Sequence, residues 1–175
     1  MTAVAPATAD AARRLLVVGD SLAVGTAPYI PRELSAWRVQ QRVEVSLQHY
    51  SAASIMRSYG RALPRVIHVS AGTNGSPGDI AGFRASVRAV MAAAGPRRCV
   101  VWANIVRPPY GGVSYGGLNR VLADESRKRK NLRIVNWVRL ARQNPGWFGS
   151  EGVHPTATGY GVRSRRVATS VRRCD

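Results

Sequence analysis

The sequence predicts an α/β protein in which a doubly wound, five-stranded parallel sheet lies between two layers of helices. Two observations carry this prediction: five short apolar segments alternate with stretches of helical spacing, and no segment repeats another. Strands that are apolar on both faces are typical of parallel sheets covered by helices on both sides. With 175 residues, 45% of them hydrophobic and 20% charged, the chain is long enough to bury a core.

Each element follows from a local pattern. Apolar or alternating segments predict strands over residues 15–18, 39–47, 66–69, 99–105 and 132–135. Helical spacing and capping residues predict helices from residue 21 onward (interrupted at residues 28 and 31) and over 54–63, 79–94, 118–130, 137–142 and 156–173. Residues 1–12 are Ala-rich and lack the basic start and apolar core of a signal peptide. We therefore expect a flexible segment over residues 1–12 and one domain over residues 13–175.

The composition is strongly basic, with a formal net charge of +17 from 26 basic and 9 acidic residues. Only two of the basic residues, Lys128 and Lys130, are lysines. This charge would attract anionic partners such as cell-wall polymers, glycans or lipid. An excess of arginine also arises from coding bias, with ordinary surface positions filled by arginine. Zinc-finger spacing and RNP-type aromatic motifs are absent, so we expect no specific nucleic-acid partner. No run reaches the ~18 apolar residues of a membrane span. We expect the protein to be a monomer.

The two cysteines are placed informatively. Cys99 opens the fourth predicted strand, and Cys174 ends the last predicted helix. Strands begin and helices end on one side of a doubly wound sheet, so both thiols should lie opposite the active-site edge. They either form a disulfide, which would indicate an extracytoplasmic or secreted protein, or remain free thiols, which would favour the cytoplasm. Two cysteines exclude a multi-cysteine metal site.

Gly19-Asp20-Ser21-Leu22 follows the first predicted strand and brings Ser21 to the strand's carboxyl end, where ligands and catalytic groups collect. The alternative is an ordinary helix cap, since Asp and Ser are favoured there. The stretch lacks the Gly-Lys-Ser/Thr of a P-loop and the G-x-G-x-x-G of a dinucleotide site, so no cofactor is expected. Gly19-Asp20-Ser21-Leu22-Ala23 is close to the G-x-S-x-G elbow of α/β-hydrolases. That elbow normally lies well inside the chain, whereas Ser21 follows the first strand, so this class is not indicated.

The three histidines have different expected roles. In Glu151-Gly152-Val153-His154, the carboxylate can reach back to Nδ1–H, so that Nε2 faces a hydroxyl, as in serine hydrolysis. The alternative is a solvent-facing loop histidine. His68, in the middle of the third predicted strand, is expected in the core. His49, where the second predicted strand leaves the sheet, is expected at the surface or in a pocket wall.

Asn74 follows the third predicted strand, which neighbours the first in the common doubly wound order. Its side-chain amide would then lie beside Ser21 and could donate to an oxyanion. The alternative is an asparagine that satisfies backbone groups of a turn.

Gly19-Asp20-Ser21-Leu22, Gly72-Thr73-Asn74 and Glu151-x-x-His154, in this order over residues 15–171, resemble the motifs of the SGNH (GDSL) hydrolase family, and in particular its small bacterial esterase domains. The resemblance implies a flavodoxin-like three-layer fold, with Ser21 as the nucleophile and His154 as its base. It also implies an oxyanion hole made by the Ser21 N–H, the Asn74 side chain and an N–H of the second motif.

Two positions depart from the family pattern. Glu151 stands where the family usually has Asp, and the second motif region, residues 50–54, has no glycine. Any backbone N–H other than that of proline can donate, so Ala52 or Ala53 would complete the oxyanion hole.

The resulting expectation is a metal-independent serine esterase that hydrolyses short-chain acyl or acetyl esters of a small molecule or a glycan. The loop over residues 107–117 is expected to form a pocket wall in which Arg107 and Tyr110 contact substrate; Arg107 either reads an acidic group or has a structural role. One alternative is an O-acetyltransferase acting on cell-surface glycan, because the short chain and the ending over residues 147–154 resemble domains associated with bacterial O-acyltransferases. Another is a non-catalytic module that binds anionic polymer through its basic surface.

Overall fold

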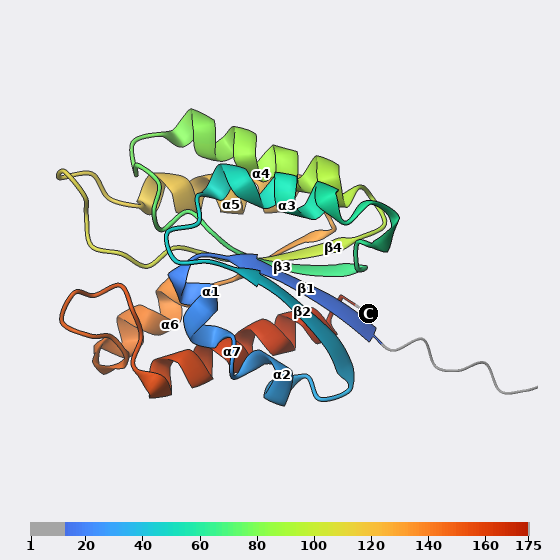
Figure 1. The fold of residues 1–175 in the computed structure, drawn as a ribbon. Helices are drawn as coiled ribbons and strands as arrows, with labels where there is room; N and C mark the ends of the chain where they lie inside the picture. Colours follow the sequence, from blue (N-terminus) through green and yellow to red (C-terminus); the bar gives the residue numbers. More distant parts are fainter. Residues whose placement is uncertain (1–12, 175) are drawn as a thin grey trace, which may run out of the picture.

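A five-stranded parallel sheet runs through the middle of the structure, with strand order β2-β1-β3-β4-β5 (Figure 1). The computed structural model describes residues 13–174; residues 1–12, where we expected a flexible segment, and residue 175 lie outside the described residues. The strands are β1 Arg13–Gly19, β2 Trp37–Val43, β3 Val66–Ser70, β4 Cys99–Ala103 and β5 Leu132–Val135. The α/β fold with a five-stranded parallel sheet is therefore confirmed.

Two layers of helices cover the sheet (Figure 1). Helices α3 Ala52–Ser58, α4 Ile80–Ala94 and α5 Gly116–Lys128 lie on one face, and α1 Ser21–Thr26, α2 Ile30–Glu33, α6 Trp137–Gln143 and α7 Ala157–Arg172 lie on the other. Three short 3-10 helices complete the set: η1 His49–Ser51, η2 Gly60–Ala62 and η3 Pro145–Trp147. Strand β1 serves both layers, because Leu16 and Val18 pack under α3 to α5 whereas Leu15 and Val17 pack on the α7 side.

Several predicted boundaries were wrong, for identifiable reasons. The second strand ends at Val43 and not at residue 47, because Ser46 turns the chain with a φ of 66° and Val45 is exposed. The helix expected over 54–63 is divided at Gly60, whose φ is 51°. The fourth strand stops at Ala103, two residues early, and α5 begins at Gly116.

The predicted disulfide between Cys99 and Cys174 is confirmed, with a Cα–Cα distance of 5.8 Å. It joins the start of β4 to the second residue beyond the C-terminal end of α7. As expected, the bond lies at the edge where strands begin, at the right-hand end of the sheet in Figure 1 near the marked C-terminus. The opposite edge, at the left, collects the loops that follow the strands.

Candidate active site

Ser21 is the first residue of α1 and directly follows the turn out of β1. The Asp20 carboxylate caps this helix by accepting a hydrogen bond from the Leu22 N–H at 3.1 Å. The turn requires Gly19, because a Cβ there would lie 2.5 Å from the Ser70 carbonyl oxygen of β3. Asp20 thus satisfies the helix cap and leaves the Ser21 hydroxyl available for a partner across the edge.

That partner is His154, which lies 133 positions further along the chain. Its Nε2 is 2.9 Å from the Ser21 Oγ. The histidine is held in the loop before α7 by backbone bonds: Gly149 N–H donates to the His154 carbonyl at 3.0 Å, and Thr156 N–H donates to the Trp147 carbonyl at 2.7 Å. Thr156 then caps α7. The loop is therefore fixed on both sides of the imidazole.

Glu151 lies on the far side of the imidazole. Its Oε1 accepts the His154 backbone N–H at 2.8 Å and lies 2.9 Å from His154 Nδ1. These hydrogen bonds lower the pKa of the Glu151 carboxyl, and the bond from the His154 backbone N–H has the largest effect. The two side chains are about half exposed, at 47% for Glu151 and 48% for His154. A glutamate therefore reaches the position that orients the imidazole, even though it is one methylene longer than aspartate.

The three side chains open into a hollow of about 340 Å³. It is lined by Ser21, Asn74, Arg107, Pro108, Pro109, Tyr110, Glu151, Val153 and His154. Most of the residues singled out from the sequence therefore come together at one place, although they derive from four separate segments: the start of α1, the loops after β3 and β4, and the loop before α7.

Asn74 lies in this hollow with Ser21, as the sequence predicted. Its Nδ2 also lies 3.4 Å from the Leu47 carbonyl oxygen, at hydrogen-bond distance. An amide group has two N–H donors, so one remains for an oxyanion. The first-turn N–H of α1 at Ser21 has no acceptor within its own helix. Asn74 and Ser21 therefore supply two donors at the same edge.

Ala52 and Ala53 do not line this hollow. Both are buried in the first turn of α3. The expectation for His49 was wrong: it lies on η1, is buried, and its Nδ1 is 2.9 Å from the Ser86 hydroxyl of α4. Its ring packs edge-on against Phe83.

Arg107 and Tyr110 both line the hollow, on the loop after β4. The Arg107 guanidinium donates to the Thr73 carbonyl and stands 5.8 Å from the centre of the Tyr115 ring. It therefore braces the loop that carries Asn74. Tyr110 is 65% exposed and forms an isolated antiparallel bridge with Val113.

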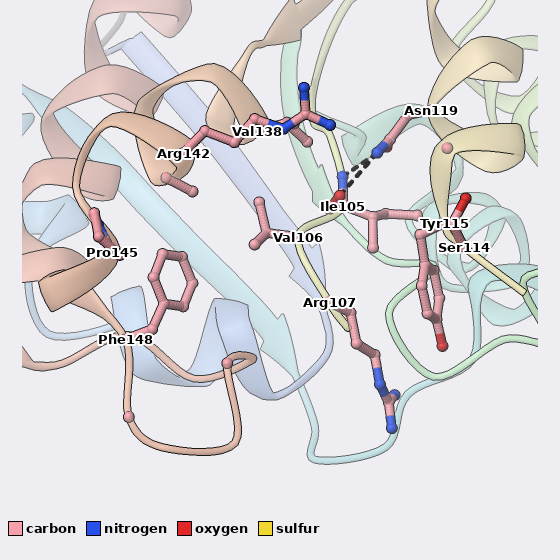
Figure 2. Close-up of a pocket in the computed structure, with 14 residues that line it drawn as sticks. Ile105, Val106, Arg107, Ser114, Tyr115, Asn119, Val138, Arg142, Pro145 and Phe148 are labelled. Atoms are coloured by element: carbon pink, nitrogen blue, oxygen red, sulfur yellow. Dashed lines mark hydrogen bonds between the residues drawn. The ribbon is translucent and has the colours of Figure 1, made fainter. Parts of the chain in front are cut away.

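A second, more apolar cavity of about 410 Å³ adjoins the hollow and shares Arg107 with it. Figure 2 shows Phe148 and Val106 turned toward this space, with Arg107 leading away from it. The Ile105 side chain points toward Tyr115 and is part of the core, and its backbone is bonded to the Asn119 amide. The sequence analysis missed this cavity. Its signal was the presence of apolar residues at positions 105, 106 and 148 in loops at the active-site edge.

Two buried polar side chains, His68 and Arg163, do not line the hollow. His68, confirmed in the core, is fully buried, with its Nδ1 3.0 Å from the Val101 carbonyl oxygen; burial lowers its pKa to about 3. Arg163 of α7 is only 1% exposed and donates from Nη2 to the Ser70 hydroxyl at 3.0 Å. The sequence analysis missed Arg163, although its spacing of four from Gly159 and Val167 puts it on the buried face of α7.

Neither a family model nor a curated protein sequence matches this chain. The protein has the SGNH hydrolase fold. Solved structures with this fold match nearly the whole chain, at low sequence identity.

Three of these structures illustrate the likeness. The C-terminal catalytic domain of peptidoglycan O-acetyltransferase A from Streptococcus pneumoniae has a TM-score of 0.73 at 15% identity, covering 93% of this chain and 92% of that one. A member of the lipolytic G-D-S-L family from Veillonella parvula has a TM-score of 0.74 at 15% identity, covering 91% and 98%. The esterase EstA from Pseudoalteromonas sp. has a TM-score of 0.71 at 13% identity, covering 92% and 97%.

Within residues 13–174, no three histidine, cysteine or acidic side chains are grouped so that they could hold a metal ion. No helix in the same range has the length and apolar character needed to cross a membrane.

Proposed function

We propose that the protein is a serine esterase that hydrolyses short-chain carboxylic esters. The observation that carries the proposal is the hydrogen-bonded series in which Ser21 Oγ lies 2.9 Å from His154 Nε2 and His154 Nδ1 lies 2.9 Å from Glu151. A serine hydroxyl is a weak nucleophile until a base within hydrogen-bond reach removes its proton. The same series argues against a non-catalytic module, for which it would have no use.

The reaction has two halves. His154 Nε2 takes the proton of Ser21 as the oxygen attacks the acyl carbonyl, and the oxyanion receives hydrogen bonds from the Asn74 amide and the Ser21 N–H. His154 then returns the proton to the departing alcohol, which leaves an acyl ester on Ser21. A water molecule, deprotonated by His154, attacks this ester, and the proton returns to Ser21 as the free acid leaves.

Glu151 orients the imidazole through its contact with Nδ1 and stabilises the imidazolium that forms in each half-reaction. Ala52 and Ala53 stay candidates for a third oxyanion donor only if α3 shifts, because neither lines the hollow as it stands. Arg107 and Tyr110 lie where the alcohol or acyl part of an ester would contact them. Arg107 is the cation there that can receive an acidic substituent.

The substrate class we favour is an acetyl or short acyl ester of a glycan or small molecule outside the cytoplasm. The disulfide is consistent with an extracytoplasmic location. The half-exposed side chains of His154 and Glu151 leave water free to reach the acyl-enzyme, which favours hydrolysis.

O-acetyl transfer to a cell-surface glycan is the second candidate. It is favoured by the similarity in fold to the catalytic domain of peptidoglycan O-acetyltransferase A. The chemistry differs only in the second half-reaction, in which a sugar hydroxyl replaces water. The hydrophobic cavity beside the hollow would help transfer if a bound acceptor excluded water there.

The test combines p-nitrophenyl acetate turnover with labelling by a serine-directed fluorophosphonate. We expect Ser21→Ala to abolish both, with the label located on residue 21 by peptide mass spectrometry. Ser76→Ala is the matched control, because Ser76 is an exposed serine on the loop after β3 and does not line the hollow. Unchanged turnover and absence of labelling at Ser21 would contradict the proposal.

A second measurement separates hydrolysis from transfer. Acetate release and acetylated product are quantified with and without an added chitooligosaccharide acceptor. We expect free acetate to dominate in both cases. A product distribution dominated by the acetylated acceptor would instead establish transfer as the principal reaction.

A further inference from the structure

A second concave site lies at the edge of the sheet opposite the candidate active site. It is a hollow of about 370 Å³ between the starts of β3, β4 and β5 and the end of α7. In Figure 1 this edge is the right-hand end of the sheet, where the C-terminus is marked. We call it the basic hollow. Its charged lining residues are Arg65, Arg97, Arg98, Lys130, Arg133 and Arg173.

The charge of the basic hollow is one-sided. Among the described residues, no aspartate or glutamate lines it. The acidic side chains of the described residues lie elsewhere; Asp124 and Glu125, for example, pair with arginines of α4 and α5. Coding bias would distribute arginines over the surface, whereas here six cations face one concavity. Such an arrangement repels itself and is stabilised by a bound anion.

The basic hollow is also partly preorganised. Arg98 is fixed because its guanidinium donates to the Leu63 carbonyl at 3.2 Å and to the Ala94 carbonyl at 3.1 Å. The Asn131 amide donates to the carbonyls of Gly95 and Arg98 and so holds the loop between α4 and β4. The Cys99–Cys174 disulfide, which also lines the hollow, attaches the end of the chain beside Arg173. The exposed cations are therefore carried on a braced framework.

We propose that the basic hollow is a binding site for a phosphate-bearing polymer of the cell surface. Guanidinium groups match the geometry of phosphate oxygens with paired donors, and five of the six cations are arginines. The side chains of Arg65, Arg97, Lys130, Arg133 and Arg173 are exposed, which suits successive charges along a chain. The disulfide at the site points to an oxidising compartment, where a non-nucleic polyanion is the appropriate partner.

The position of the site has a functional consequence. Because the basic hollow and the Ser21 hollow lie at opposite edges of the sheet, a bound polymer would leave the catalytic groups uncovered. The polymer would hold the protein at the surface and not act as its substrate. This inference does not depend on the proposed esterase activity.

The experiment is isothermal titration with poly(glycerol phosphate) of defined length at about 0.15 M salt, where long-range attraction between exposed charges is largely screened. The test variant carries Arg97→Gln, Lys130→Gln and Arg173→Gln. The control variant carries Arg32→Gln, Arg57→Gln and Arg139→Gln, which remove equal charge from exposed positions outside the basic hollow. We expect at least about tenfold weaker binding for the test variant and less than about twofold for the control.

Two further arms decide the class of ligand. Orthophosphate should bind far more weakly than the polymer, and single-stranded DNA with the same number of phosphates should not bind more tightly than the polymer. Equal losses for the test and control variants would overturn the proposal in favour of general charge attraction. Tighter, hollow-dependent binding of DNA would overturn it in favour of a nucleic-acid site. Thermal unfolding of each variant excludes loss of fold as the cause. An Arg97→Lys/Arg173→Lys variant, which keeps the charge but loses the paired donors, should bind less tightly than the wild type and more tightly than the test variant.

Discussion

Arg163 and Asp20 lie buried on either side of the Ser70 hydroxyl. The Arg163 Nη2 donates to the Ser70 Oγ at 3.0 Å, and that hydroxyl lies 3.5 Å from the Asp20 Oδ1. Burial raises the pKa of the Asp20 carboxyl, and the positive charge of Arg163 opposes this rise. Asp20 caps the helix that begins with Ser21, and Arg163 belongs to the helix that follows His154. The pair therefore ties together the two elements that carry the reacting groups.

Replacing Arg163 with methionine should strongly destabilise the protein. Removal of one partner leaves the Asp20 carboxylate buried without its compensating charge, which costs about 3–5 kcal/mol of the free energy of unfolding. The measurement is urea unfolding followed by circular dichroism. Arg166→Met is the control, because Arg166 is an exposed arginine of the same helix and should change stability by less than about 0.5 kcal/mol. Adding Asp20→Asn to Arg163→Met should recover part of the loss; no recovery would contradict the coupling.

His154→Ala should reduce ester hydrolysis more than Glu151→Gln. Without the imidazole no base lies within reach of the Ser21 hydroxyl, and kcat should fall by about 10³-fold or more. The contact between Glu151 and His154 is half exposed to water, which weakens it, so its loss should lower kcat only about tenfold. Steady-state kinetics of both variants provide the test. Equal damage by the two substitutions would mean that the glutamate is as essential as the base.

Acidification should destabilise the protein through His68. The folded state keeps this side chain neutral down to a pKa of about 3, whereas the unfolded chain takes up a proton near the ordinary value of 6.5. The unfolded state therefore binds more protons between these values, and stability is lost as pH falls. Between pH 7.5 and 5 the loss should be about 2 kcal/mol.

The raised pKa of Asp20 acts in the opposite direction, because the folded state then takes up a proton before the unfolded state does. The His68 contribution is therefore measured as a difference in slope. The free energy of unfolding is followed against pH for the wild type and for His68→Gln. We expect the variant to have the shallower dependence. Identical slopes would show that His68 does not remain neutral in the folded state.

Reduction of the Cys99–Cys174 disulfide should lower stability by about 2–4 kcal/mol. The bond closes a loop with a sequence separation of 75, and its main effect is to restrict the unfolded chain. Thermal unfolding with and without reductant, together with a Cys99→Ala/Cys174→Ala variant, measures the effect. Thiol titration of the denatured, unreduced protein should find no free thiol among these two cysteines. Two titratable thiols would be the contrary result.

The sequence was sufficient for the β1 turn because the turn rests on a local pattern plus the rules of parallel-sheet topology. The same rules placed both cysteines at one edge of the sheet but left open whether they bond. Four apolar residues before Gly19 predict a strand, and strand ends in such a sheet share an edge. Boundaries were less predictable. The alternation over residues 39–47 continues beyond Val43, but the positive φ of Ser46 ends the strand, and a backbone dihedral at a serine leaves no signal in the sequence.

His49 shows how one such boundary changes the site. With a strand extending to residue 47, we expected this histidine at the surface or in a pocket wall. The early turn instead puts it on η1, where it packs against Phe83 and contacts Ser86 of α4. Phe83 and Ser86 lie more than 30 residues further along the chain, so the packing of α4 decides this part of its environment.

The sequence by itself determined the alternation of strands and helices, the edge at which Ser21, Asn74 and His154 would meet, and the opposite edge at which the two cysteines would lie. These follow from hydrophobic periodicity and chain direction, which are local properties. The tertiary structure decided which distant groups came within hydrogen-bond distance: His154 with Ser21, Arg163 with Ser70, and the cations of the basic hollow with one another. Such distances depend on how the helices pack on the sheet, and packing is a property of the whole chain.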